Sequence, residues 1–151
     1  MSWIHWLRSR ELHTASPAES VSSAAVRMAD HRIGALLVLE GDDLVGILSE
    51  RDILRRVLAE KRDPEKTTVG EVCTTDIKSV LEDAQLSECA DLIKQHGFRH
   101  VPVVNAEGAA VAMLSSRDFL RYAVDELETL VAKAYAGQRV EEQTDPFSQA
   151  G

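Results

Sequence analysis

The stretch LSERDILR, residues 48–55, recurs 66 residues later in the chain as LSSRDFLR, residues 114–121. In both places a run of apolar residues leads into the stretch, and apolar side chains at helical spacing follow it. A serine at the end of a predicted strand is thus followed twice by an arginine and an aspartate at the start of a predicted helix. We therefore predict an internally duplicated domain that carries a related site in each half.

The agreement extends to the residues before the repeated stretch. Two predicted helices carry apolar side chains at i, i+3, i+4 and i+7, and the copies are offset by 65 residues. They are Val21, Ala24, Ala25 and Met28 in the first copy and Leu86, Cys89, Ala90 and Ile93 in the second. A β-rich run (35–39 and 101–104), a turn (41–43 and 106–108) and a return strand (44–48 and 109–114) follow each helix. The copies therefore agree in element order and in apolar phase.

These patterns predict an α/β fold. Each copy has the order β-α-β-β-α, with short leading strands near residues 12–15 and 77–80. A unit of about 60 residues buries only about 60% of its unfolded surface, so one copy alone is marginally stable. Two tandem repeats packed sheet against sheet, as one pseudo-twofold module with a C-terminal helix extension, complete a single core.

The chain divides into six expected segments. They are an apolar N-terminal segment (1–11), repeat 1 (12–62), a linker with a short helical turn (63–74), repeat 2 (75–124), a C-terminal helix extension (125–137) and a disordered tail (138–151). Pro64 is expected to end the helix before the linker. Thr68 and Glu71 have the spacing of a capping box for the helical turn.

The composition excludes several classes of function. The chain has 17 basic and 25 acidic residues, a net charge of −8, which opposes binding of a nucleic-acid polymer. No apolar run is long enough to span a membrane, and residues 1–10 lack the features of a secretory signal. The two cysteines, Cys73 and Cys89, do not form a metal-type pair. We expect a cytoplasmic protein with reduced thiols.

The repeated serine and aspartate have two interpretations. Ser49 and Asp52, like Ser115 and Asp118, have the spacing of a helix capping box. A cap does not require the arginine that recurs between them in both copies. Amides at a helix N-terminus bind phosphate, and a carboxylate accepts hydrogen bonds from the two hydroxyls of a ribose. The second interpretation is therefore a nucleotide site.

The residues around the motif resemble a known family. Residues 46–52, GILSERD, resemble the Gly-h-x-(Ser/Thr)-x-x-Asp signature of CBS domains (cystathionine-β-synthase type). Residues 98–104, FRHVPVV, resemble the second-repeat strand of that family. The resemblance covers roughly residues 12–124, and its doubling matches the paired form called a Bateman module.

The resemblance implies binding of an adenosine-containing ligand in clefts between the repeats. AMP, ADP or ATP is expected, NAD or S-adenosylmethionine is possible, and no cofactor is required. The resemblance implies that the ribose is held by Asp52 and Asp118. It assigns the phosphates to Ser49, Arg51, Arg99, His100, Ser115 and Arg117, and the base to apolar strand residues, for which we select Ile33 and Pro102.

The two predicted sites differ. Gly46 is matched by Ala112 in the second copy, whose added methyl group is expected to narrow the approach there. The second copy has Arg99 and His100 where the first has glycine and alanine, and in the family such basic residues reach across the cleft. We therefore expect ligand at Asp52, with weaker or no binding at Asp118.

Other motifs support no further chemistry. His96 and His100 are four residues apart, but Gly97 interrupts the helix that metal chelation at this spacing needs, and no metal site is expected. His31 and His96 match between the copies and suit helix C-termini, where a cation is favoured. The sequence contains no triad, paired acid–base carboxylates or nucleophile elbow, so we do not expect an enzyme.

The chain ends carry apolar side chains outside the repeats. Residues 3–7 contain Trp3, Ile4, Trp6 and Leu7, which pack onto their own domain or a dimer partner, or else form a lid or a docking element. An apolar stripe after the second repeat suits homodimerisation. It consists of Leu120, Val124, Leu127, Val131 and Ala134.

Together these observations predict a non-catalytic regulatory module. It binds an adenine nucleotide and signals to a separate, unidentified partner protein. The alternative is a dimeric interaction scaffold whose clefts no longer bind a ligand.

Overall fold

The computed structural model describes residues 2–142 of the 151-residue chain. Residues 1–116 form one compact unit that contains both sheets, and a second unit begins at Arg117. Within the described residues, no helix combines the length and apolar character that crossing a membrane requires.

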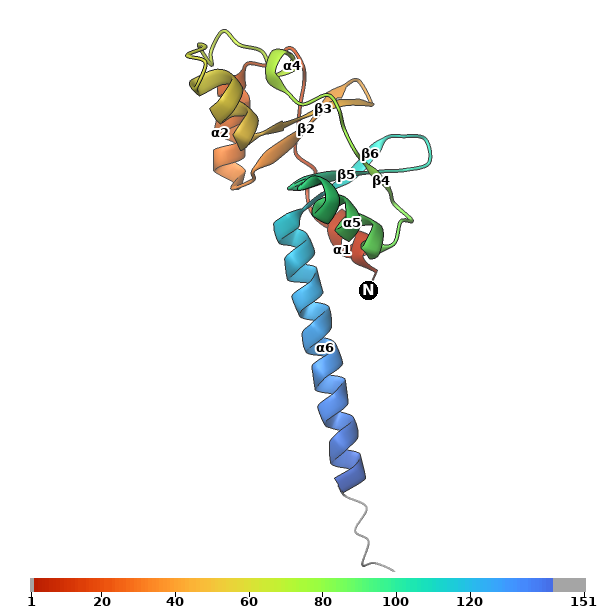
Figure 1. The fold of residues 1–151 in the computed structure, drawn as a ribbon. Coiled ribbons are helices and arrows are strands. Elements are labelled where there is room, and N and C mark those ends of the chain that lie inside the picture. Colours follow the sequence, from red (N-terminus) through yellow and green to blue (C-terminus); the bar gives the residue numbers. More distant parts are fainter. Residues whose placement is uncertain (1, 143–151) are drawn as a thin grey trace, which may run out of the picture. The chain divides into compact units, whose positions relative to one another are not determined.

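Two sheets of the same topology confirm the predicted duplication (Figure 1). The first contains β1 (Thr14–Ala15), β2 (Ala35–Glu40) and β3 (Asp43–Ser49), and the second contains β4 (Val80–Leu81), β5 (His100–Val104) and β6 (Ala110–Ser115). In each sheet the short leading strand is parallel to the middle strand, which pairs with the last strand in antiparallel register. Both hairpins shift register at matching positions, after Val38 and after Val103. The pseudo-symmetry thus extends to the irregularities of the hairpins.

The helices also follow the repeat. α2 (Val21–His31) and α5 (Leu86–His96) have the same length, and both end in a residue with left-handed conformation, Arg32 and Gly97. The linker contains α4 (Val69–Val72), whose Thr68 amide donates to Glu71 Oε2 at 2.8 Å, as the capping-box spacing predicts.

The helix after the first motif departs from the prediction. α3 (Glu50–Ile53) continues as a wide π-helical turn, η1 (Leu54–Leu58). This helix ends six residues before Pro64, in a turn where Lys61 has a φ of 56°. Pro64 is therefore not the residue that ends it.

The corresponding helix of the second copy is much longer. α6 spans Ser116–Glu142. The prediction that it closes near Gly137 is wrong, because Gly137 is not among the described glycines with a positive φ that would cap the helix. The first five residues of the predicted disordered tail are helical, and residues 143–151 lie outside the described part of the chain.

The core forms where α2 covers one face of the first sheet. Val21, Ala24 and Met28 of the helix pack with Leu36 and Val38 of β2. Side chains alternate along a strand, so Ala35 and Leu37 point to the opposite face, and they are also fully buried. Both faces of the middle strand are therefore covered, as expected for two sheets that share one interior.

The N-terminal segment forms α1 (Trp3–Arg8) and packs within its own domain. α1 contacts β6, and its Trp3 and Leu7 are buried. The Trp3 indole donates to the carbonyl oxygen of Ala84 at 3.1 Å, and Arg8 pairs with Glu82 at 2.7 Å. These contacts join the beginning of the chain to the second repeat.

Candidate functional site

The first copy of the motif lies where β3 ends and α3 begins. The Asp52 amide donates to Ser49 Oγ at 3.1 Å, and the Ser49 amide donates to Asp52 Oδ2 at 2.9 Å. The Ser49 hydroxyl also donates to the same carboxylate oxygen at 3.0 Å. The capping-box interpretation is therefore correct for this copy, and the cap holds the carboxylate in a fixed orientation.

The linker supplies further partners of Asp52. Thr74 Oγ1 donates to Asp52 Oδ1 at 3.0 Å, and Arg56 Nε lies 3.9 Å from that oxygen. The Asp52 side chain is only 11% exposed. A carboxylate has about four lone-pair sites, so these contacts do not exhaust its capacity to accept hydrogen bonds from sugar hydroxyls.

Thr74 reaches Asp52 because the end of the linker crosses β3. The amides and carbonyls of Ile47 and Thr74 exchange two hydrogen bonds, of 2.8 and 2.9 Å. A Cβ atom at Gly46 would lie 2.7 Å from Cys73 Sγ, so the crossing requires glycine there. Thr74 was missed by the sequence analysis, since nothing in the sequence indicates where the linker crosses the sheet.

This crossing explains the difference between Gly46 and Ala112. Ala112 is buried in β6, and no isolated backbone bridge to β6 like that between Ile47 and Thr74 occurs in the described residues. The glycine is thus required by the linker in the first repeat. The methyl group of Ala112 is accordingly not evidence for a narrowed second site.

The second repeat meets the first beside this motif. The Glu50 amide donates to the Gly34 carbonyl at 2.9 Å. A methyl group at Gly34 would lie 3.5 Å from both Cε1 and Nε2 of His100 and 3.5 Å from Glu50 Oε1. The His100 imidazole, from β5, therefore lies beside Gly34, whose carbonyl oxygen accepts the hydrogen bond from Glu50 at the start of α3. We call Gly34, Glu50 and His100 the strand junction.

The other predicted site residues have varied surroundings. Arg51 and Arg99 are exposed, and Ile33 is partly buried against the core of the first repeat. Pro102 is fully buried, so a base contacts it only if neighbouring side chains move.

The second copy of the motif spans the two structural units. Ser115 ends β6 in the first unit and is partly buried. Arg117, which is exposed, and Asp118 lie in the first turn of α6, in the second unit.

The two thiols are buried and carry no signature of a nucleophile. Burial raises the pKa of the Cys73 thiol, and the nearby Asp52 carboxylate raises it further. Burial, with a smaller contribution from Glu88, raises the pKa of Cys89 to about 11. Reactive cysteines have a lowered pKa, so both residues are packing residues.

A hollow of about 700 Å³ lies between β4 and α5, away from the motif. Its lining includes Asp83, Glu88 and Asp91, whose charges oppose a phosphate. In the first repeat, the residues that correspond to its Ala84 and Leu92 are Glu19 and Arg27, which form a two-pronged ion pair with both distances 2.7 Å. The hollow therefore marks where the second repeat lacks this pair.

Comparisons with known proteins agree with the duplicated fold. The profile of the CBS domain family matches residues 7–59 and 69–125. The CBS domain-containing protein YhcV of Bacillus subtilis is 34% identical over 105 residues, which are 70% of this chain and 74% of that protein.

Solved structures give the same result. The crystal structure of the CBS domain NE2398 matches this chain with a TM-score of 0.74 and 33% sequence identity. The matched region includes 80% of this chain and 95% of the NE2398 chain. The structure of CBSX2 in complex with AMP matches with a TM-score of 0.65 and 25% sequence identity. The matched region includes 76% of this chain and 89% of the CBSX2 chain. CBS pairs are in general regulatory modules.

Proposed function

Because the chain belongs to the CBS domain family, we propose that it is a regulatory module that binds an adenine nucleotide beside Asp52. The observation that carries this proposal is the strand junction, where the His100 imidazole of one repeat and the Glu50 carboxylate of the other both lie next to Gly34. A ligand held there contacts both repeats at once. The AMP complex of CBSX2 supports the choice of nucleotide.

The roles of the residues follow from their positions. The Asp52 carboxylate accepts hydrogen bonds from the ribose hydroxyls, and its cap on Ser49 fixes its orientation before the ligand arrives. The exposed Arg51 and Arg99 provide positive charge for the phosphate, and the His100 imidazole offers it a hydrogen-bond donor. Glu50 lies at the same junction and opposes additional negative charge, so we favour AMP over ATP.

The regulatory step requires that the nucleotide bind two states of the module differently. Thr74 links Asp52 to the end of the linker, which leads directly into the second repeat. Nucleotide binding at Asp52 thus acts on the segment that joins the repeats. We propose that the resulting change is recognised by a separate partner protein in the cytoplasm.

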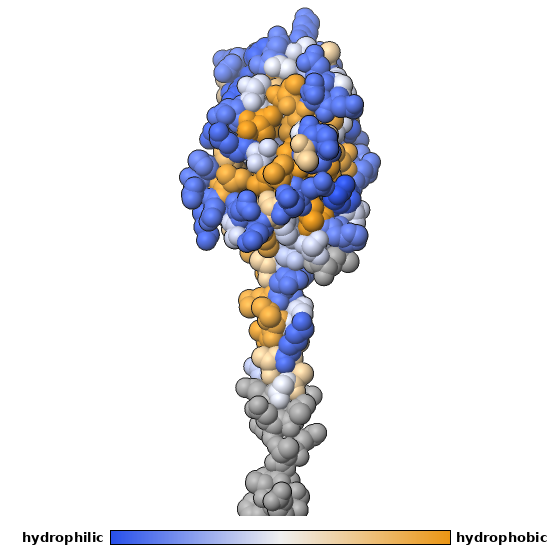
Figure 2. All heavy atoms as spheres, turned by 90° about the vertical axis from the view of Figure 1, so that its right-hand side faces the viewer, coloured by the Kyte–Doolittle hydropathy of each residue, from blue (hydrophilic) through white to orange (hydrophobic). Residues whose placement is uncertain are grey.

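We also propose that the module is a homodimer that pairs through α6. Four apolar residues of the predicted stripe on this helix are 44–63% exposed in the single chain, and Figure 2 shows apolar side chains gathered along one side of it. They are Leu120, Val124, Leu127 and Val131. Their spacing of four, three and four residues continues to Ala134, as in the seam of a coiled coil. A second copy of the same helix presents the matching stripe.

A thermal-shift panel tests the nucleotide proposal. The purified protein is titrated with AMP, ATP, NAD and S-adenosylmethionine, alongside Asp52→Asn and the matched variant Asp118→Asn. A ligand at a hundredfold excess over its Kd adds about 2.7 kcal/mol to the free energy of unfolding. We expect a shift with AMP that Asp52→Asn removes and Asp118→Asn preserves. If no ligand shifts the melting temperature, the interaction scaffold is the better interpretation.

A further inference from the structure

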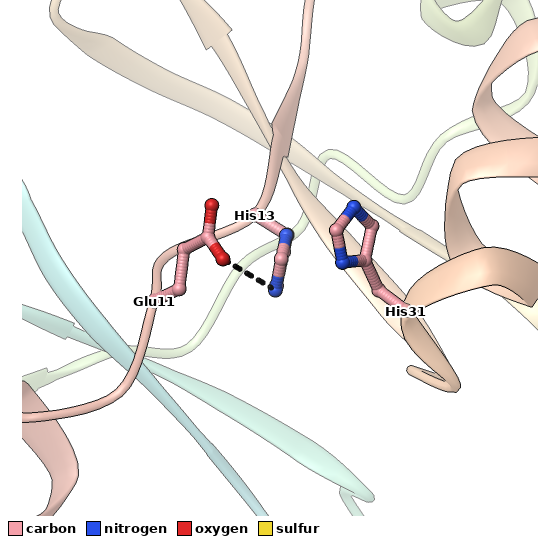
Figure 3. A group of neighbouring side chains, drawn as sticks. All are labelled: Glu11, His13 and His31. Carbon is pink, nitrogen blue, oxygen red and sulfur yellow. Dashed lines mark ion pairs between the residues drawn. The ribbon is translucent and has the colours of Figure 1, made fainter.

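Three potential metal ligands meet outside the nucleotide site. Glu11 and His13 lie in the segment that leads into β1, and His31 is the last residue of α2. One ligand atom from each side chain lies within 4.8 Å of the other two. Figure 3 shows the imidazoles of His13 and His31 next to each other, with Glu11 on the other side of His13. We call these residues the Glu11–His13–His31 cluster.

The backbone on both sides of the cluster is held in place. The carbonyl oxygen of His13 accepts a hydrogen bond from the Leu37 amide at 3.3 Å, next to the pairing of β1 with β2. The Arg27 guanidinium, from α2, donates to the Thr14 carbonyl at 3.0 Å. This bond joins the helix that carries His31 to the residue that follows His13. Two of the three ligands are therefore positioned by the fold.

The distances between the three side chains are close to those needed to bind one small ion. The ring centroids of His13 and His31 are 4.3 Å apart, and Glu11 Oε2 lies 3.9 Å from His13 Nε2. Ligand atoms about 2.1 Å from a tetrahedral zinc ion are roughly 3.4 Å from one another. Small side-chain rotations are sufficient to bring the three groups to that separation. The His13 side chain is only 16% exposed, which limits its alternative orientations.

We propose that the Glu11–His13–His31 cluster binds one divalent transition-metal ion of the zinc class. Two imidazoles and a carboxylate are a ligand set that Zn²⁺ accepts, with water in the fourth position. Imidazole favours zinc-class ions over Mg²⁺ and Ca²⁺, which prefer oxygen ligands. The ion would tie the C-terminal end of α2 to the segment before β1.

The second repeat provides an internal comparison. The residues that correspond to Glu11, His13 and His31 at the 65-residue offset are Asp76, Lys78 and His96. Lys78 and Asp76 are 3.9 Å apart, the same separation as His13 and Glu11, so an ordinary ion pair occupies the matching place. A charged lysine cannot bind a metal ion, because it has no lone pair. The proposal therefore requires one ion per chain.

Isothermal titration calorimetry with zinc chloride tests this site. The chain is prepared without an affinity tag and freed of metal with EDTA, then compared with His13→Gln, His31→Gln and the matched control His96→Gln. We expect one Zn²⁺ per chain, affinity lowered tenfold or more in the first two variants, and unchanged affinity in the control. Cobalt(II) added to the unmodified protein should give the visible absorption bands of a tetrahedral site, a readout that does not depend on how a variant folds.

Two results would overturn the proposal. One is the absence of stoichiometric Zn²⁺ binding together with the absence of a tetrahedral cobalt spectrum. The other is an equal loss of affinity in His31→Gln and His96→Gln, which would place the ion elsewhere on the surface. Circular dichroism of each variant verifies that lost affinity does not reflect unfolding.

Discussion

Thr74 donates a hydrogen bond from its Oγ1 to Oδ1 of Asp52 at 3.0 Å, across 22 residues of sequence. Ser49 holds the other carboxylate oxygen through its amide and hydroxyl. The carboxylate is therefore positioned from both sides, by the start of α3 and by the end of the linker. The hydrogen bond thus connects Asp52 directly to the segment that joins the repeats.

The first prediction concerns this hydrogen bond. Thr74→Val keeps the side-chain shape and removes the donor, which leaves Asp52 Oδ1 less satisfied in a buried place. We expect the free energy of unfolding to fall by about 1–3 kcal/mol. Urea unfolding measures the change. The exposed neighbour Thr75 supplies the control Thr75→Val, and equal stability of the two variants would show that the bond contributes nothing.

The second prediction concerns the close approach of the linker to β3. Gly46→Ala places a methyl group 2.7 Å from Cys73 Sγ, so the linker must shift. Overpacking of this kind costs about 1–3 kcal/mol. We expect Cys73→Ala to recover part of the loss, because it removes the sulfur atom. A double-mutant cycle measures this coupling, and strict additivity of the two changes would contradict the proposed contact.

The third prediction concerns the ion pair between Glu19 and Arg27. The hydrogen bonds from Arg27 lower the pKa of Glu19 below the usual value of a glutamate. A lowered pKa in the folded state means that the stabilisation is fully present above the unfolded value and disappears as the pH falls through the folded one. Glu19→Gln should therefore be destabilising near neutral pH and lose its effect in acid.

Urea unfolding of Glu19→Gln at about pH 7 and about pH 3.5 measures this dependence. The exposed residue Glu60 provides the control Glu60→Gln, which should change little at either pH. If Glu19→Gln lowers the free energy of unfolding by the same amount at both pH values, the ion pair does not stabilise the fold.

The fourth prediction concerns the thiols. Both cysteines are buried and their pKa values are raised, that of Cys89 to about 11. We expect a thiol reagent to label neither residue quickly in the native protein and to label both in denaturant. Mass spectrometry of the labelled peptides distinguishes the two positions. Rapid labelling of Cys73 in the native state would mean that the linker opens away from Gly46.

The sequence predicted the elements that the repeat defines. The 65-residue offset places α2 and α5 at matching positions, and the two β-rich apolar runs identify β2 and β5. These features depend on local patterns, which a single sequence displays. The capping role of Ser49 and Asp52 is local as well, and the structure contains it as predicted.

Features that depend on contacts between distant segments were not predictable. No sequence pattern around Thr74 indicates its contact with Asp52. Cys73 and Gly46 meet only because the linker crosses β3. The cluster of Glu11, His13 and His31 combines an extended segment with the end of a helix, and its residues have no metal-binding spacing in sequence. In each case the residues come into contact only through the tertiary packing of distant segments.

Calorimetry with AMP tests the central proposal most directly, on the unmodified protein and on His100→Ala and His96→Ala. Both histidines belong to the second repeat, but only His100 lies at the strand junction, while His96 stacks on Phe98. We predict that the unmodified protein binds AMP, that His100→Ala lowers its affinity at least tenfold, and that His96→Ala leaves it unchanged. No AMP binding by the unmodified protein, or an equal loss in both variants, would contradict a nucleotide site between the repeats at this junction.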